Sequence, residues 1–247
     1  MALKKHLPNL ITLVNLLSGC IAVLYAVFGH LEAAALFVAI GIGFDFFDGF
    51  AARLLKVEGA LGKQLDSLAD MVTSGLVPGI VMMQMLLKAS TENTLEPLLV
   101  AATFQWLPFC GLLVTLASAY RLANFNIDTR QTSSFVGLPT PANTLLIVSL
   151  PLICKHSEFT FVVALLQNKY LLLALTFLSV YLLNAEIPLF ALKFKNFSWR
   201  DNAFKFLFLG LSLLLLLLLQ FVAVPLIVLL YVTISVWKHF RSINTSD

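Results

Sequence analysis

The sequence predicts an all-α protein, a single polytopic bundle of helices integral to a membrane. Of the 247 residues 60 % are apolar and only 12 % are charged, and the mean hydropathy is +0.93. Soluble domains carry a charge on roughly a quarter of their residues, so this composition is typical of membrane proteins. Eight apolar runs approach or reach the roughly 20 residues that cross the hydrocarbon core. Because we find neither an internal repeat nor a linker, residues 1–247 are expected to form one domain.

Polar residues set the boundaries of these eight predicted spans. The fifth run is short, since its apolar part stops before Lys155, His156 and Glu158. The stretch 158–169 is expected to be an interfacial or re-entrant piece. Gln220 and Pro225 provide the break between the last two runs. The predicted spans are residues 8–28, 32–53, 67–87, 97–120, 139–156, 170–191, 203–219 and 221–238.

The first run has some features of a cleaved leader, since a basic start, MALKKH, precedes an apolar stretch as in signal peptides. Asn9, Thr12 and Asn15 lie inside this stretch, however, and the apolar run continues beyond Cys20 to Phe28. A short apolar leader has neither property. We therefore expect residues 8–28 to be a retained first helix.

Basic residues are distributed asymmetrically between the two ends of the predicted spans. With eight spans and both termini cytoplasmic, all but three of the 16 Lys and Arg residues lie on the cytoplasmic side, the exceptions being Lys88, Lys155 and Lys169. Because Lys and Arg concentrate in cytoplasmic loops, the asymmetry supports this topology. The net charge of +3 is too small to predict a nucleic-acid partner.

Four aspartates, Asp45, Asp48, Asp66 and Asp70, lie in or beside the second and third predicted spans. A carboxylate at the bilayer centre costs on the order of 2.5 to 3.5 kcal/mol, so four of them require a function. The first two are three residues apart and the last two are four apart, so each pair shares one helix face. The loop between the helices, 54–61, is short, which makes them antiparallel neighbours whose acidic faces can meet.

Carboxylates held close together repel unless cations lie between them, and acid oxygens suit hard ions such as Mg²⁺ or Mn²⁺. The sequence therefore predicts a divalent metal site. Two other interpretations stay open. Each aspartate could cap a helix or pair with Arg53, Lys56 or Lys63, and acids inside spans also line the paths of cation transporters. Transport would call for acids across the whole bilayer depth, whereas these four gather toward one end.

Written as spacing, the segment 45–70 reads D-x-x-D-G-x-x-A-R, eight residues, then G-x-x-x-D-x-x-x-D. This pattern resembles the signature of the CDP-alcohol phosphatidyltransferase family at each of its eight defined positions. The resemblance implies an integral membrane enzyme that transfers a phosphatidyl group from a CDP-linked lipid to an alcohol and releases CMP. It also implies a homodimer in the cytoplasmic membrane of a prokaryote. The distribution of Lys and Arg predicts that the acidic segment, and with it the active site, faces the cytoplasm.

Carried onto this sequence, the resemblance implies a role for each motif residue. Two divalent cations, Mg²⁺ or Mn²⁺, would be bound by Asp45, Asp48, Asp66 and Asp70. Asp70 would also act as the base. The CDP moiety would be held or given room by Gly49, Ala52, Arg53, Asn9 and Thr12. The four histidines fall at span ends away from the acidic faces, so we expect direct displacement by the acceptor hydroxyl rather than a covalent intermediate.

Three further stretches resemble the membrane-embedded phosphatidylserine synthases of bacteria and archaea within this family: LPNLITLVNLLSG, GKQLDSLADMVTSGLVP, and YRLANFNID followed by FVGLPTPA. They imply CDP-diacylglycerol and L-serine as substrates. The carboxylate of serine needs a cation, for which Arg121 is the best placed residue, although Arg121 could be only a positive-inside anchor. The expected serine site comprises Arg121, Asn15, Lys63 and Asn126. Asn124 stands where many relatives carry a second Arg, which leaves the carboxylate of serine to Arg121 or Lys63. Glycerol 3-phosphate, inositol phosphate and amino alcohols stay open as acceptors.

Overall fold

The computed structural model describes residues 2–91, 106–127, 135–189 and 198–244, nearly all of them helical, which confirms the all-α prediction. The α-helices are α1 (Ala2–Val27), α2 (Leu31–Leu55), α3 (Ala60–Asp70), α4 (Val77–Thr91), α6 (Leu113–Ile127), α7 (Thr140–His156), α8 (Thr160–Leu166), α9 (Lys169–Asn184), α10 (Trp199–Leu219) and α11 (Ala223–Asn244). Shorter elements are the π-helix η1 (Met71–Leu76), the 3-10 helices η2 (Leu107–Leu112) and η3 (Gln220–Val222), and the paired two-residue strands β1 (Phe135–Val136) and β2 (Pro188–Leu189).

Four helical stretches of the described chain are long and apolar enough to cross a membrane: His6–Val27, Leu31–Leu55, Ala60–Thr91 and Asn202–Lys238. A fifth results if α8 and α9, which meet at an angle of 74°, are counted as one bent span. A helical membrane protein fits these findings, whereas the count of eight spans stays a prediction. The predicted span 97–120 begins outside the described residues, and the predicted span 170–191 ends outside them.

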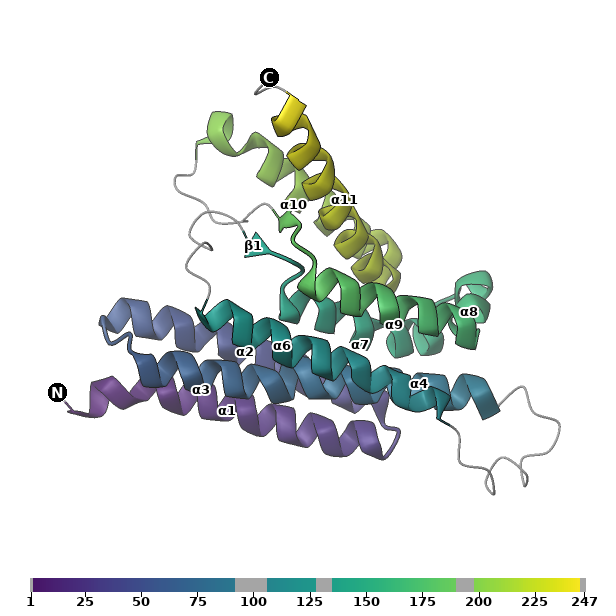
Figure 1. Ribbon diagram of the computed structural model, residues 1–247, viewed down its shortest axis with the longest axis horizontal. Helices are drawn as coiled ribbons and strands as arrows, with labels where there is room; N and C mark the ends of the chain where they lie inside the picture. The colour runs from purple at the N-terminus through teal and green to yellow at the C-terminus, as the bar shows by residue number, and fades with distance from the viewer. Residues whose placement is uncertain (1, 92–105, 128–134, 190–197, 245–247) are drawn as a thin grey trace.

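The layer that carries the acidic motif consists of α1, α2 and the continuous stretch from α3 through η1 to α4, which lie side by side (Figure 1). The chain reverses between α1 and α2 at Gly29, whose φ of 78° is open to glycine without strain. Helix α1 packs along α2 in this layer. That residues 8–28 are a retained first helix stays a prediction.

The connection between α2 and α3 is tighter than the predicted loop 54–61. Helix α2 continues to Leu55 and α3 begins at Ala60, which leaves only four connecting residues. The N–H of Val57 donates to the carbonyl of Ala52, and Lys56 takes a left-handed conformation (φ 53°, ψ 45°), so the end of α2 is closed by its own backbone. The two acidic helices are thus antiparallel neighbours, as predicted.

The second layer, α6 to α9, packs against the first (Figure 1). Glu32 at the start of α2 contacts both Lys155 and His156 at the end of α7. These contacts join the two layers at the end of the bundle remote from the short α2–α3 connection. The predicted interfacial or re-entrant piece 158–169 contains the short helix α8, which lies at this same end.

Helices α10 and α11 form a hairpin that stands at a steep angle to the first layer (Figure 1). The ring centroids of Phe208 and Tyr231 are 6.0 Å apart, and the Nζ of Lys238 lies 5.5 Å from the ring centroid of Phe204. A straight helix would separate Phe208 from Tyr231 by about 35 Å. The chain therefore reverses near Gln220, which has φ 49° and ψ −122°, in agreement with the predicted break.

Apolar side chains fill the interior and also cover much of the outside. Val38, Val81 and Ile147 are fully buried where the two layers meet. Most leucines of the stretch 211–219 are exposed. The acidic motif is an exception to this apolar pattern.

Candidate active site

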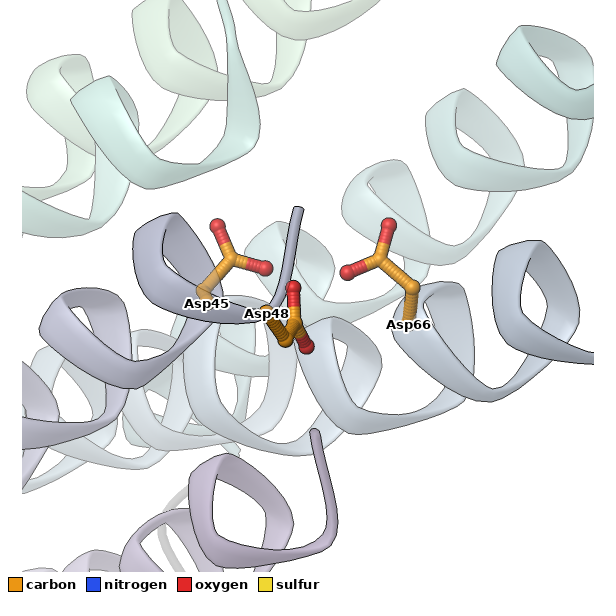
Figure 2. Close-up of side chains that lie close together, drawn as sticks. All are labelled: Asp45, Asp48 and Asp66. Atoms are coloured by element: carbon orange, nitrogen blue, oxygen red, sulfur yellow. The ribbon is translucent and has the colours of Figure 1, made fainter. Parts of the chain in front are cut away.

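Three of the four aspartates come together. Asp45 and Asp48 lie in the interior of α2, one turn apart, and Asp66 faces them from α3. Each offers a carboxylate oxygen, and these oxygens all lie within 4.8 Å of one another (Figure 2). Asp48 is buried, and the other two are partly buried. The short α2–α3 connection and the three-residue spacing on α2 account for this meeting.

The basic residues near the cluster do not neutralise it. In the described part of the chain, no Lys or Arg forms an ion pair with any of the four aspartates. Arg53 and Lys56 are exposed, and the Nζ of Lys63 donates to the backbone oxygen of Asn126 at 3.0 Å. Asp70 is the N-cap residue of η1 but makes no side-chain capping hydrogen bond, and the other three lie inside helices. The interpretation that the aspartates cap helices or pair with these cations therefore has no support among the described residues.

Like charges at this separation are unfavourable without a counter-ion. The donor set therefore fits a divalent cation: three carboxylates, oxygen ligands only, held by two helices whose relative position is fixed by a short connection.

Asp70 lies one turn beyond Asp66, at the end of α3, and is not among the three mutually close aspartates. Its Oδ1 accepts a hydrogen bond from Nδ2 of Asn15 at 3.5 Å. It still interacts electrostatically with Asp45 and Asp66. The geometry thus divides the four acids into a compact group of three and an adjacent fourth held from α1.

Asn9, Thr12 and Asn15, three polar residues of the first predicted span, lie on α1 next to the acids. The hydroxyl of Thr12 donates a hydrogen bond to Oδ2 of Asp48, and Asn15 contacts Asp70 as described. Asn9 lies beside α3, since a Cβ on Gly62 would be 3.4 Å from its Oδ1. All three α1 residues therefore border the acidic helices, and two of them bind carboxylates directly.

The motif residues that follow Asp48 leave space. A Cβ added to Gly49 would meet only Nη1 of Arg53, at 3.7 Å. Ala52, three residues further along α2, is partly buried. A small side chain at each position keeps this side of α2 open next to the carboxylates.

Arg121 on α6 is only 8 % exposed. Its Nη1 donates to Oγ1 of Thr140 at 3.0 Å, and its Nε is buried with no hydrogen-bond partner among the described residues. The guanidinium also interacts electrostatically with Asp70. A simple positive-inside anchor would expose its charge to water and headgroups, so the burial of Arg121 argues against that interpretation.

Lys63 and Asn126 also lie close together, but their hydrogen bonds are to groups within the protein. Besides the bond from Lys63 to the backbone of Asn126, Nδ2 of Asn126 donates to Oγ of Ser67 at 2.8 Å. These bonds tie α3 to the C-terminal end of α6, where a Lys ammonium is favoured by the helix dipole. Of the four residues predicted for serine, Arg121 is therefore the one with a buried, unpartnered donor.

Comparison with known proteins places this site within a family. The model of the CDP-alcohol phosphatidyltransferase family matches residues 5–182, which include the whole acidic motif. The chain belongs to this family. The aspartates are therefore part of the motif of a phosphatidyltransferase family, and this interpretation replaces that of a path for transported cations.

Individual relatives within the CDP-alcohol phosphatidyltransferases are similar over about 60 % of the chain. The CDP-diacylglycerol--serine O-phosphatidyltransferase of Bacillus subtilis is 32 % identical over 150 residues, which are 59 % of this chain and 75 % of that protein. The archaetidylserine synthase of Methanothermobacter thermautotrophicus is 31 % identical over 157 residues, 62 % of this chain and 61 % of that protein. The CDP-diacylglycerol--serine O-phosphatidyltransferase of Mycobacterium leprae is 30 % identical over 151 residues, 58 % of this chain and 46 % of that protein. The match thus spans three quarters of the first relative but less than two thirds of the other two.

Sequence reasoning missed several buried polar residues around the site of this phosphatidyltransferase. Ser118 lies one turn before Arg121, is fully buried and has no partner for its hydroxyl among the described residues. Its three-residue spacing from Arg121 on a helix was a usable signal. Thr140 and Thr73 carried no comparable signal, because their partners are distant in sequence and, for Thr73, because a π-helix sets its direction.

Proposed function

We propose that the chain transfers the phosphatidyl group of CDP-diacylglycerol to the hydroxyl of L-serine, giving phosphatidylserine and CMP. The observation that carries the proposal is the group of three unpaired carboxylates next to Asp70, within the motif of the family. The names of the relatives support serine as the acceptor.

The metal site of this proposal holds two divalent cations, Mg²⁺ or Mn²⁺, with Asp45, Asp48 and Asp66 as ligands and Asp70 as a ligand of the second. When bound, such cations neutralise the diphosphate and stabilise the leaving CMP. The closeness of these carboxylates supports this assignment, together with the lack of an ion pair to Lys or Arg among the described residues.

The chemical step in the proposal is a direct displacement. Asp70 takes the proton of the serine hydroxyl, the serine oxygen forms a bond to the phosphorus of the phosphatidyl group, and the bond from that phosphorus to the CMP oxygen breaks. His30 and His156 lie at the remote end of the bundle, which is consistent with a route that uses no histidine nucleophile.

Substrate contacts are assigned from position. The CDP moiety occupies the open side of α2 at Gly49 and Ala52, with Arg53, Asn9 and Thr12 around it. The carboxylate of serine binds Arg121, whose Nε is free to donate. Asn15, Lys63 and Asn126 are the other residues expected to contact serine. Lys63 and Asn126 are the weaker candidates, because they bind each other.

The membrane arrangement of this proposal has eight crossings, with both termini and the acidic site at the cytoplasmic face of the cytoplasmic membrane. Helix direction supports it, because α7 ends beside the start of α2 and α11 ends beside the start of α10. The distribution of Lys and Arg supports the orientation. A homodimer completes the proposal as the assembly expected for the family.

An acceptor assay tests the proposed function. The purified protein is given CDP-diacylglycerol, Mg²⁺ or Mn²⁺, and one labelled acceptor at a time: L-serine, glycerol 3-phosphate, inositol phosphate or ethanolamine. We expect labelled phosphatidylserine only, with release of CMP and no product in chelator. Incorporation of glycerol 3-phosphate without serine would overturn the choice of acceptor.

A further inference from the structure

A chain of two hydrogen bonds connects Thr73 to Asp70 through Asn15. The hydroxyl of Thr73 lies within hydrogen-bond distance of two oxygens of Asn15, Oδ1 at 2.9 Å and the backbone oxygen at 3.2 Å, and the nearer one, Oδ1, is part of the chain. Nδ2 of Asn15 in turn donates to Oδ1 of Asp70 at 3.5 Å. Thr73 and Asn15 are both fully buried. The chain joins α1 to the helix that carries the acid, and neither bond is part of the carboxylate cluster itself.

These contacts define which way the amide of Asn15 points. An amide has one acceptor end and one donor end, and the carboxylate of Asp70 can only accept when ionised. With the hydroxyl of Thr73 donating to the oxygen of Asn15, the NH₂ group is directed at Asp70. The reversed amide would place two acceptor oxygens against each other. The carboxylate of Asp70 thus selects the direction of the Asn15 amide, and the hydroxyl of Thr73 holds the other end of that amide in place.

Two glycines provide the space for this arrangement. A Cβ on Gly41 of α2 would lie 2.7 Å from Cγ2 of Thr73 and 2.9 Å from Oδ1 of Asn15. A Cβ on Gly19 of α1 would lie 2.3 Å from Oγ1 of Thr73. Contacts this short do not occur between real atoms, so the close approach of both helices to Thr73 depends on glycine at both positions.

The local helix geometry changes between the acid and the threonine. Asp70 and Thr73 both face α1, where Asn15 reaches both. The π-helix η1 begins at Met71, immediately after Asp70, and includes Thr73. Single π-turns are often found at functional sites.

We propose that Thr73 is a positioning residue for the transfer reaction: acting through Asn15, it holds the carboxylate of Asp70 in the orientation that accepts the proton of the attacking hydroxyl. The proposal rests on the function proposed above. Asp70 is outside the close group of three carboxylates, and Asn15 contacts it from α1. Misplacing a catalytic group by about 1 Å can lower a rate by roughly 100-fold.

The test compares Thr73→Val, which removes the hydroxyl at nearly constant volume, with Thr73→Ser, which retains it. We expect Thr73→Val to lower kcat roughly 10- to 100-fold, with KM for CDP-diacylglycerol and the Mg²⁺ concentration for half activation unchanged. Thr73→Ser should recover kcat to within a few-fold of the parent. An unchanged kcat in Thr73→Val would overturn the proposal, as would a higher KM at constant kcat.

The matched control is Thr144→Val. Thr144 is also fully buried, and its hydroxyl donates to the backbone oxygen of Ser74 in the same π-helix at 2.7 Å, without contacting Asn15. We expect this variant to retain kcat within about twofold while its melting temperature in detergent falls as much as that of Thr73→Val. An equal loss of kcat in both variants would mean that disturbing η1 is sufficient, and would overturn the role of Thr73.

A double variant tests the connection through Asn15. If Thr73 acts by way of Asn15, then Asn15→Leu and the double variant Thr73→Val/Asn15→Leu should have the same kcat, whereas independent effects would multiply. Multiplying effects would overturn the connection. The activity of the parent protein separates the two proposals. If the parent does not use serine, the proposed acceptor is wrong. The role of Thr73 is then tested with the same variants and the acceptor that the parent does use.

Discussion

The hydroxyl of Thr12 on α1 donates a hydrogen bond to Oδ2 of Asp48 on α2. This bond orients a buried carboxylate of the cluster from a helix that contributes no acid of its own. Thr12 is expected to face the CDP moiety. Because it also binds Asp48, we expect Thr12 to affect metal binding as well.

Replacing Thr12 with valine should weaken metal activation. Partners that orient a metal ligand typically contribute 10- to 100-fold in affinity or activity, so we expect the Mg²⁺ or Mn²⁺ concentration for half activation to rise by about 10-fold in Thr12→Val. Activity measured over a metal titration checks this, with Thr12→Ser as the control that retains the bond. Equal metal dependence in Thr12→Val and the parent would contradict the prediction.

Asp70→Asn should separate binding from chemistry. The amide of asparagine cannot take a proton from the acceptor, so phosphatidyl transfer should fall by at least 100-fold, the contribution typical of a general base. Binding of CDP or CMP in the presence of Mg²⁺, measured by calorimetry, should stay within a few-fold of the parent because the close group of three carboxylates is intact. Normal turnover of Asp70→Asn would show that another group is the base.

Asp45→Asn and Asp66→Asn should behave differently from Asp70→Asn. Each removes a charge from the close group of carboxylates, so metal activation and nucleotide binding should weaken together, each by 10-fold or more. The same metal titration and calorimetry measure both quantities. If either variant kept the metal dependence of the parent, its aspartate would not be a ligand.

Arg121→Lys should impair the use of serine specifically. Lysine cannot reproduce the planar fork that donates to Thr140 and to a carboxylate at the same time. We expect KM for serine to rise about 10-fold or more, with KM for CDP-diacylglycerol unchanged. Lys63→Met is the comparison, since Lys63 is exposed and bound to Asn126, and its KM for serine should change less. The opposite order would move the carboxylate site to Lys63.

Much of this arrangement could be predicted from the sequence, because it depends on local periodicity. Long apolar runs predict the helices, the spacing of Asp45 and Asp48 predicts a shared face, and the short loop before Asp66 predicts that the faces meet. The break at Gln220 was likewise visible as a polar residue within an apolar run.

The remainder depends on contacts between residues far apart in the chain. The π-helix after Asp70 changes the direction of the side chains that follow. The sequence of residues 71–76 does not predict this π-helix, because it forms where α1, α2 and α6 pack against the segment. The bond between Arg121 and Thr140 crosses from α6 to α7 and was equally hidden. For the same reason, the position of Asp70 beside the group of three, rather than within it, could not be derived from spacing.

The unpaired carboxylates of the cluster also bear on the stability of the protein. Helices α2 and α3 bring Asp45, Asp48 and Asp66 together whether or not a cation is bound, so the metal-free fold contains electrostatic repulsion that the unfolded chain does not. A cation that binds only the folded state raises the free energy of unfolding, by about 2.7 kcal/mol at 100 times its dissociation constant. We therefore expect the melting temperature in detergent to rise with Mg²⁺ or Mn²⁺ in the parent and to respond much less in Asp66→Asn, which makes thermal stability a readout of metal binding that requires no substrate.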